Sequence, residues 1–149
     1  MSLFIRTQSI NNNQSDSAYL ELTLEPETAI IGKKNMVPGD KVNGVINVAN
    51  TGTVDTYYFI SVKWYAYTGT STIQASRLAN ALEIEIEVPD PYIIYAGKLS
   101  ELIDQPPGGR LLTLDIANED LEIIISLPKN SGTHLAGIAL FFDLIFVAT

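Results

Sequence analysis

Residues 36–67 read MVPGDKVNGVINVANTGTVDTYYFISVKWYAY, and this stretch decides the fold class. Apolar and polar residues alternate with a period of two through residues 42–48 and again through 57–66, and the turn-forming sequence NTGT (50–53) lies between them. This pattern predicts two antiparallel strands joined as a hairpin, each with one face in a hydrophobic core. Trp64, the single tryptophan, lies on the apolar face, and we expect it to anchor that core. The residues on the two buried faces would be Val42, Gly44, Ile46, Val48, Tyr58, Ile60, Val62, Trp64 and Ala66.

Short segments with the same alternation continue along the chain. They predict strands at residues 2–10, 18–26, 82–88, 92–96, 111–116, 121–127 and 138–148, with a loop at 104–110 (DQPPGGR). Ser76 is a suitable N-cap for a short helical turn that reaches Leu82, a second turn fits residues 98–103, and no helix longer than two turns is expected. The 149 residues suffice for one domain with one core. The sequence therefore predicts an all-β protein, an antiparallel β-sandwich.

The first and last predicted strands differ from the others. Residues 2–10 (SLFIRTQSI) alternate, but the polar, turn-forming residues 11–17 separate them from the next strand. They are either an ordinary first strand or a strand detached from its domain. The last segment is apolar on both faces, as expected for a strand in the middle of a sheet. It is too short for a membrane-spanning helix and contains Asp143. One of its faces would meet the sandwich core, and a partner subunit could cover the other.

Composition excludes several classes of function. The net charge is -8 and the nine Lys and Arg residues are dispersed, which argues against a nucleic-acid partner. The absence of cysteine excludes disulfides, a thiolate nucleophile and Cys-based metal sites. The first ten residues lack the apolar run of a signal peptide, so the chain is either cytosolic or begins after processing or cloning, and we favour the second alternative.

No catalytic constellation is visible in the sequence. His134 is the only histidine, which leaves no HExxH motif, and a loop histidine of this kind is usually a surface residue. Glu83, Glu85 and Glu87 have the spacing of the solvent face of a strand. The acidic group at residues 118–122 could hold calcium weakly, but it lacks the EF-hand pattern and is better interpreted as a solvated turn. We therefore predict that the protein is not an enzyme and that it has no metal or cofactor.

Two further features bear on binding. Tyrosines at positions 57, 58, 65 and 67 could form a sugar- or partner-binding face, although cross-strand aromatic pairing explains them more simply. Asn13 begins an N-glycosylation sequon in the polar linker, which matters only if the protein is exported.

Residues 18–64 resemble the N-terminal half of the TasA/camelysin family of biofilm-matrix proteins, which includes related archaeal bundling pilins. The shared features are LxLTLxP at residues 20–26, a hydrophobic residue before Pro-Gly-Asp at 37–40, and an alternating strand that leads into N-[ST]-G at 50–52. A weaker likeness continues through residues 82–88, through 93–102 and through the last two strands.

The resemblance implies a jelly-roll or Ig-like sandwich that is exported, loses a signal peptide and polymerises head-to-tail into extracellular fibres, which could bundle. Residues 1–17 would be a donor strand with its linker, and residues 18–149 the sandwich that accepts the strand of a neighbour. The donor residues would be Leu3, Phe4, Ile5, Arg6, Thr7, Gln8 and Ile10, and the candidate acceptor or core residues Trp64, Leu140, Phe142, Leu144 and Phe146.

Two other functions remain open at this stage. One is a monomeric cell-surface module that binds carbohydrate or protein. The other is a metallopeptidase, because camelysin has been classed as one, but a single histidine without a zinc motif gives no reason to carry that activity over.

Overall fold

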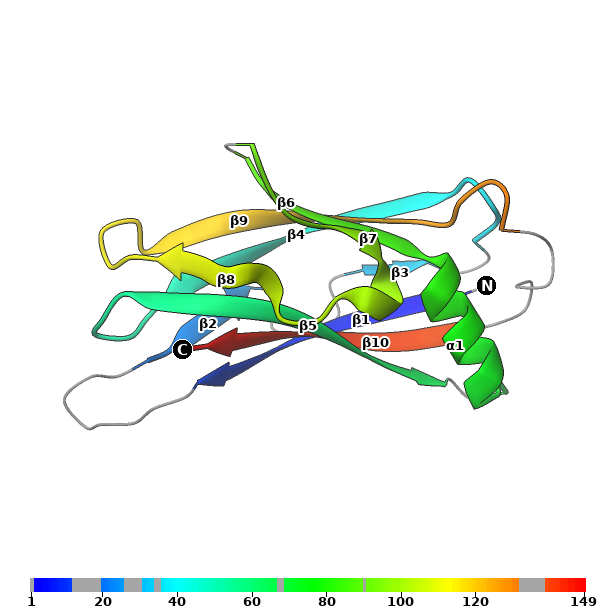
Figure 1. Ribbon diagram of the computed structural model, residues 1–149, viewed down its shortest axis with the longest axis horizontal. Coiled ribbons are helices and arrows are strands. Elements are labelled where there is room, and N and C mark those ends of the chain that lie inside the picture. The colour runs from blue at the N-terminus through cyan, green and yellow to red at the C-terminus, as the bar shows by residue number, and fades with distance from the viewer. Residues whose placement is uncertain are drawn as a thin grey trace.

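Two five-stranded sheets face each other across one core (Figure 1). The computed structural model describes residues 2–11, 20–25, 31–33, 36–66, 69–89, 91–131 and 139–149. Sheet A has the order β3 (Ile31–Lys33), β1 (Ser2–Asn11), β10 (Ala139–Ala148), β5 (Thr56–Ala66), β8 (Gln105–Leu112). Sheet B has the order β2 (Leu22–Glu25), β4 (Lys41–Asn50), β9 (Asn118–Ser126), β6 (Glu83–Val88), β7 (Tyr92–Lys98). The predicted all-β sandwich is confirmed.

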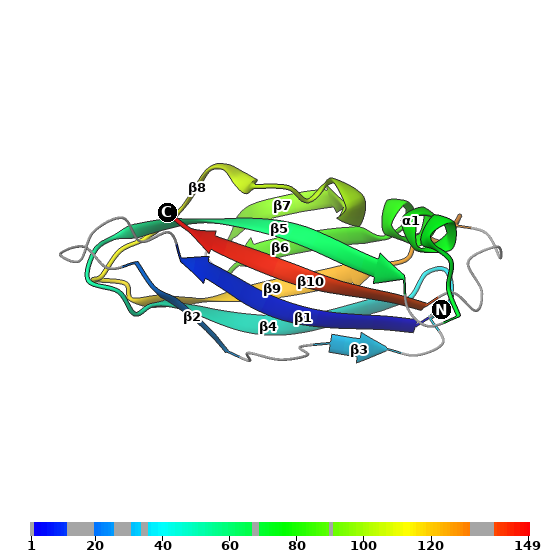
Figure 2. The same cartoon turned by 90° about the horizontal axis from the view of Figure 1, so that it is seen from below.

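The strand pairs are nested, as in a hairpin rolled into two sheets. The outermost pair is β1 with β10, followed inward by β4 with β9, β5 with β8 and β6 with β7, and successive pairs alternate between the sheets. This is the pairing order of a jelly roll. One pair departs from the antiparallel expectation, since β1 runs parallel to β10, with Leu3 opposite Leu140. The two strands lie side by side in Figure 2.

The predicted hairpin at residues 42–66 is wrong in its pairing. β4 pairs with β2 and β9 in sheet B, whereas β5 pairs with β10 and β8 in sheet A. Residues 51–55 therefore cross from one sheet to the other. The Asn50 side chain holds this crossing, because its amide donates to the carbonyl oxygens of Val54 (2.9 Å) and Leu112 (3.0 Å) and its oxygen accepts from the Gly52 amide (3.0 Å). Facing strands bury one face each just as paired strands do, so the alternation alone could not separate the two arrangements.

The core agrees with the predicted faces except at its presumed anchor. Ile46, Val48, Tyr58 and Ile60 are fully buried. Trp64 is only half-buried and packs against the margin of the core, so it is not the anchor. The largest fully buried side chains include Tyr58, Phe142 and Phe146.

Local structure corrects three predicted boundaries. The helix α1 (Thr72–Ala81) is capped by Ser71 and not by Ser76, because the Ser71 hydroxyl accepts from the Gln74 amide and the Gln74 side chain accepts from the Ser71 amide. It is also longer than the two turns expected. The short turn after β7 is the 3-10 helix η1 (Leu99–Glu101), as predicted. The predicted loop at 104–110 belongs to β8 from Gln105 onward, and this edge strand tolerates its two prolines. The predicted strand at 111–116 ends at Leu112.

The sandwich is elongated, with two dissimilar ends (Figure 1). The C-terminal pole, on the left, carries the end of β10 with loops 51–55 and 113–117. The helix pole, on the right, carries α1, the turn at 36–40 and residues 127–131. β1 begins at the helix pole and ends at the C-terminal pole, where Asn11 is opposite Ala148.

Candidate functional site

The last strand, β10, lies in the centre of sheet A between β1 and β5. Its inward side chains Leu140, Phe142, Leu144 and Phe146 are all fully buried, so these predicted residues belong to the core. The prediction that a strand apolar on both faces lies in the middle of a sheet is confirmed. Trp64, grouped with them in the prediction, is opposite Phe142 in the register but remains half-buried.

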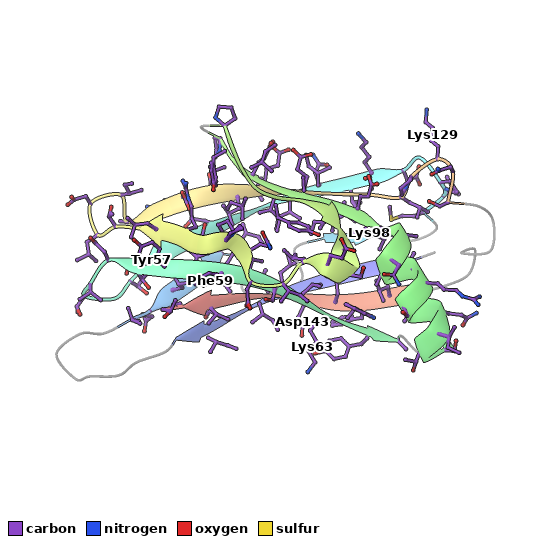
Figure 3. The ribbon with its side chains drawn as sticks, viewed as in Figure 1. Tyr57, Phe59, Lys63, Lys98, Lys129 and Asp143 are labelled. Carbon is purple, nitrogen blue, oxygen red and sulfur yellow. The ribbon has the colours of Figure 1, made fainter. Side chains whose placement is uncertain are left out.

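The outer face of β10 is partly covered by its own chain. Phe141, Ile145 and Val147 are half-buried, and Asp143 is 5% exposed. The Tyr65 hydroxyl donates to Asp143 Oδ2 (3.1 Å), and the Tyr65 ring lies 6.0 Å from that of Phe141. Lys63 Nζ lies 5.4 Å from the Tyr65 ring, and Figure 3 shows Lys63 and Asp143 on the same side of the sheet. In-sheet neighbours thus supply part of the cover that a partner subunit could provide.

The first strand, β1, occupies a place in the sheet of its own chain. All its residues from Ser2 to Asn11 are in register with β10, whereas β3 pairs, in the part of the chain described, only with Leu3, Phe4 and Ile5. The predicted donor residues 3–10 therefore lie along β10, and their donation to a neighbour stays a prediction. Thr7 is buried opposite Leu144, Ser9 is half-buried opposite Phe146, and Ile10 is 42% exposed. The second half of β1 thus turns mainly polar side chains toward the core.

A polar cluster that the sequence did not reveal joins the two sheets near the C-terminal pole. Tyr58 of β5 donates its hydroxyl to Glu119 Oε1 of β9 (2.7 Å). Arg110 of β8 binds the same carboxylate with two nitrogens, Nε to Oε1 (3.1 Å) and one terminal nitrogen to Oε2 (2.9 Å). The guanidinium also lies 5.0 Å from the ring of Tyr92. This Tyr58–Glu119–Arg110 cluster corrects the interpretation of Glu119 as part of a solvated turn.

The electrostatics of this cluster favour the protonated forms of Tyr58 and Arg110. Burial, and then the Glu119 carboxylate, raise the pKa of the Tyr58 hydroxyl far above its ordinary value. Hydrogen bonds to Glu119 raise the pKa of Arg110. Tyr58 therefore remains a proton donor, because its ionisation would place a second negative charge beside Glu119. Such a group cannot act as a nucleophile or base, and its fully buried ring is closed to a substrate.

The sequence contained only an indirect signal for this cluster. A tyrosine on the buried face of a strand requires a hydrogen-bond partner for its hydroxyl. Its acceptor lies 61 positions away in the chain, on the other sheet, so periodicity could not identify it.

The other candidate residues do not assemble into a reactive site. Asn47 donates its amide to Asn118 (3.1 Å) and Asp120 (3.0 Å), which occupies that end of the acidic group. The pKa of Glu87 is raised, first by desolvation and then by the carboxylates of Glu85 and Glu122. No group of three His, Cys, Asp or Glu side chains suited to a metal occurs among the described residues.

The predicted tyrosine face is not a single surface. Tyr58 is buried, whereas Tyr57 is exposed and Tyr65 half-buried on the outer side of sheet A. A depression on the outer side of sheet B is lined, where the chain is described, by Lys41, Glu83, Glu85 and aliphatic or small residues, with no aromatic ring to stack on a sugar. Tyr67, Asn13 and His134 lie outside the described residues.

Comparisons with known proteins give no family assignment. No family model matches the chain, and no curated protein matches it. One solved structure with a similar part is a family 123 glycoside hydrolase from Clostridium perfringens, with 12% sequence identity and a TM-score of 0.34. The likeness covers 74% of this chain but only 21% of that one. At this level of similarity it carries no functional argument.

None of the helices among the described residues is long and apolar enough to cross a bilayer.

Proposed function

We propose that this chain is the structural, non-catalytic subunit of an extracellular filament, in which the N-terminal strand of one copy completes the sheet of the next. The observation that carries the proposal is the place of β1. It is the first strand of the sandwich and is inserted between β10 and β3, and residues 12–21 connect it to β2. The resemblance to matrix-fibre proteins and bundling pilins points to the same function, and it extends the proposal to export, with a signal peptide removed, and to lateral bundling of filaments.

The energetics of β1 suit a strand that can change partners. Each large apolar side chain that it buries contributes about 1.5–3 kcal/mol. Ordering its backbone costs about 1–2 kcal/mol per residue. Because Thr7 and Ser9 on its inner side are polar, side-chain burial alone does not offset the cost of ordering the backbone of β1. The row of hydrogen bonds to β10 has to supply the remaining free energy. A row of backbone hydrogen bonds can form along the β10 of either chain, so exchange between copies replaces one such row by another.

Locking β1 to its own β10 tests the proposal. Ile10 and Val147 are opposite each other and belong to the outer side of sheet A. Neighbouring strands are about 4.8 Å apart, within the range that a disulfide spans. The chain has no cysteine, so an Ile10→Cys/Val147→Cys pair would be its only pair of thiols. We expect filaments in negative-stain micrographs of the reduced protein and no filaments in those of the oxidised protein.

The single variant Ile10→Cys is the control, and it should form filaments under both conditions. Filaments of equal length from the oxidised double variant would contradict donation of β1. Reduction of the oxidised double variant should restore assembly, which separates locking from damage to the fold.

A further inference from the structure

The two poles of the sandwich carry opposite charge. At the C-terminal pole Glu21, Asp55, Asp115 and Asp120 are acidic, and the one base close to them among the described residues, Arg110, is neutralised by Glu119. At the helix pole Arg77, Lys98 and Lys129 are exposed and form no ion pair with any described residue. Figure 3 shows Lys98 and Lys129 toward the end that carries α1.

Acidic residues at the helix pole reduce this asymmetry only in part. The Asp40 carboxylate accepts a hydrogen bond from the Val37 amide (3.0 Å) and so belongs to its own turn. Glu83 shares the depression on sheet B with Lys41. Glu101 is exposed on η1, whose N-cap is Lys98, and its charge offsets that of Lys98. The exposed cations of α1 and of residues 127–131 therefore dominate the outermost surface of the helix pole.

Each pole also exposes large apolar side chains. Leu111, Leu114 and Ile116 are exposed at the C-terminal pole, the last of them at 60%. Val37 and Ile73 are exposed at the helix pole, at 57% and 67%. Each pole thus combines exposed apolar side chains with charges of one sign, and the charges of the two poles are opposite. Two such surfaces are complementary and suited to a protein–protein contact.

We propose that copies of this chain associate end to end, with the C-terminal pole of one against the helix pole of the next. The partner is a second copy, because the same chain carries both complementary surfaces. The contact joins different surfaces, so it is head-to-tail and can continue without closing. The charges orient the encounter, and the exposed apolar residues supply the buried area. This inference rests on the proposed filament function and names the surface on which successive subunits meet.

The end-to-end contact also fixes the direction of the donated strand. β1 ends at the C-terminal pole, and residues 12–21 connect it to β2 there, since Leu22 is opposite Asn50. Ten residues reach at most about 35 Å, so a donated β1 has to enter its neighbour near the boundary between the two copies. In an end-to-end array that boundary is the neighbour's helix pole, where β10 begins. The donated strand then runs antiparallel to the neighbour's β10, opposite to its direction within one chain.

Charge reversal in the locked Ile10→Cys/Val147→Cys protein tests the end-to-end contact between the two poles separately from strand donation. We expect the oxidised locked protein to show weak, salt-sensitive self-association in sedimentation velocity. The double change Arg77→Glu/Lys129→Glu should weaken it about ten-fold, as should Asp115→Lys, by loss of attraction across the contact. Equimolar mixing of these two variants should yield alternating assemblies with tighter association than either variant shows alone, because both poles of one variant complement both poles of the other.

Lys63→Glu is the matched control, since it reverses a charge on the outer side of sheet A away from both poles. Equal weakening by Lys63→Glu, or no concentration-dependent association of the locked protein at low salt, would overturn the end-to-end contact. Filaments of the reduced protein would still support strand donation in that case, so the two proposals fail separately.

Disulfide formation in assembled filaments tests the direction. An antiparallel register with Ser9 opposite Phe142 and Thr7 opposite Leu144 keeps both side chains toward the core, and it places Ile10 of the donor beside Phe141 of the acceptor. Within one chain Ile10 is opposite Val147, about 20 Å further along β10. Filaments assembled in reductant and then oxidised should give intersubunit crosslinks with Ile10→Cys/Phe141→Cys. Crosslinks between subunits from Ile10→Cys/Val147→Cys instead would show parallel donation and contradict the end-to-end array.

Discussion

Replacing Glu119 by alanine is expected to reduce the free energy of unfolding by about 2–4 kcal/mol. The carboxylate accepts hydrogen bonds from Tyr58 and Arg110 at once, from two strands of the opposite sheet. Its removal leaves the buried Tyr58 hydroxyl without an acceptor and a guanidinium with 25% side-chain exposure without its counter-charge. Partial hydration of that guanidinium keeps the loss below the value for a fully buried pair.

Urea unfolding of matched variants measures this loss. Asp120→Ala is the control, because Asp120 is the next residue of β9, is exposed, and accepts its hydrogen bond from Asn47. We expect Asp120→Ala to cost less than about 1 kcal/mol and Tyr58→Phe about 1–2 kcal/mol, the value of one hydrogen bond. A loss for Glu119→Ala no larger than that for Asp120→Ala would show that the cluster does not join the sheets.

The position of this cluster gives it a role in the proposed filament. It fixes β8 and β9 beside the turn that carries Leu114, Asp115 and Ile116. Those residues form part of the C-terminal pole. In a filament that bears tension, the loops of this pole have to be held by both sheets. The cluster connects the two sheets next to these loops.

Alternation of apolar residues predicted the faces of the strands well and their partners poorly. It assigned Ile46, Val48, Tyr58 and Ile60 to the core, where they lie. It could not determine that β4 and β5 belong to different sheets, because that choice depends on the Asn50 side chain and on residues far away in the chain. The parallel direction of β1 relative to β10 could not be predicted from the sequence for a related reason. No tight turn joins β1 to β10, so no local feature specifies parallel or antiparallel pairing.

Side-chain size was a poor guide to depth in the core. The indole of Trp64 is the largest apolar group of the chain, but its position toward the helix-pole end of β5 places it at the margin of the core. Phe146, on the neighbouring strand, is paired with Ile60 nearer the middle of β5 and is fully buried. Its ring centroid lies 5.9 Å from that of Tyr58.

Phe146→Ala is therefore expected to destabilise the fold by about 3–5 kcal/mol, through lost burial and the cavity left behind. Trp64→Ala removes a larger side chain but should cost less, about 1–3 kcal/mol, because half-exposed surface contributes only part of its transfer free energy. Urea unfolding of both variants compares them, and a larger loss for Trp64→Ala would contradict the placement of the core.

The same comparison bears on assembly. Phe146 of β10 is opposite Ser9 of β1, so it belongs to the strand beside which β1 lies. A donated strand lies beside the β10 of the neighbour in the same way, in either direction of insertion. Phe146→Ala should therefore destabilise filaments as well as monomers, whereas Ile10→Cys/Val147→Cys, when oxidised, should affect filaments alone. If Phe146→Ala filaments resisted denaturant as well as the unmodified filaments do, the donated strand would have to rest on a surface other than β10.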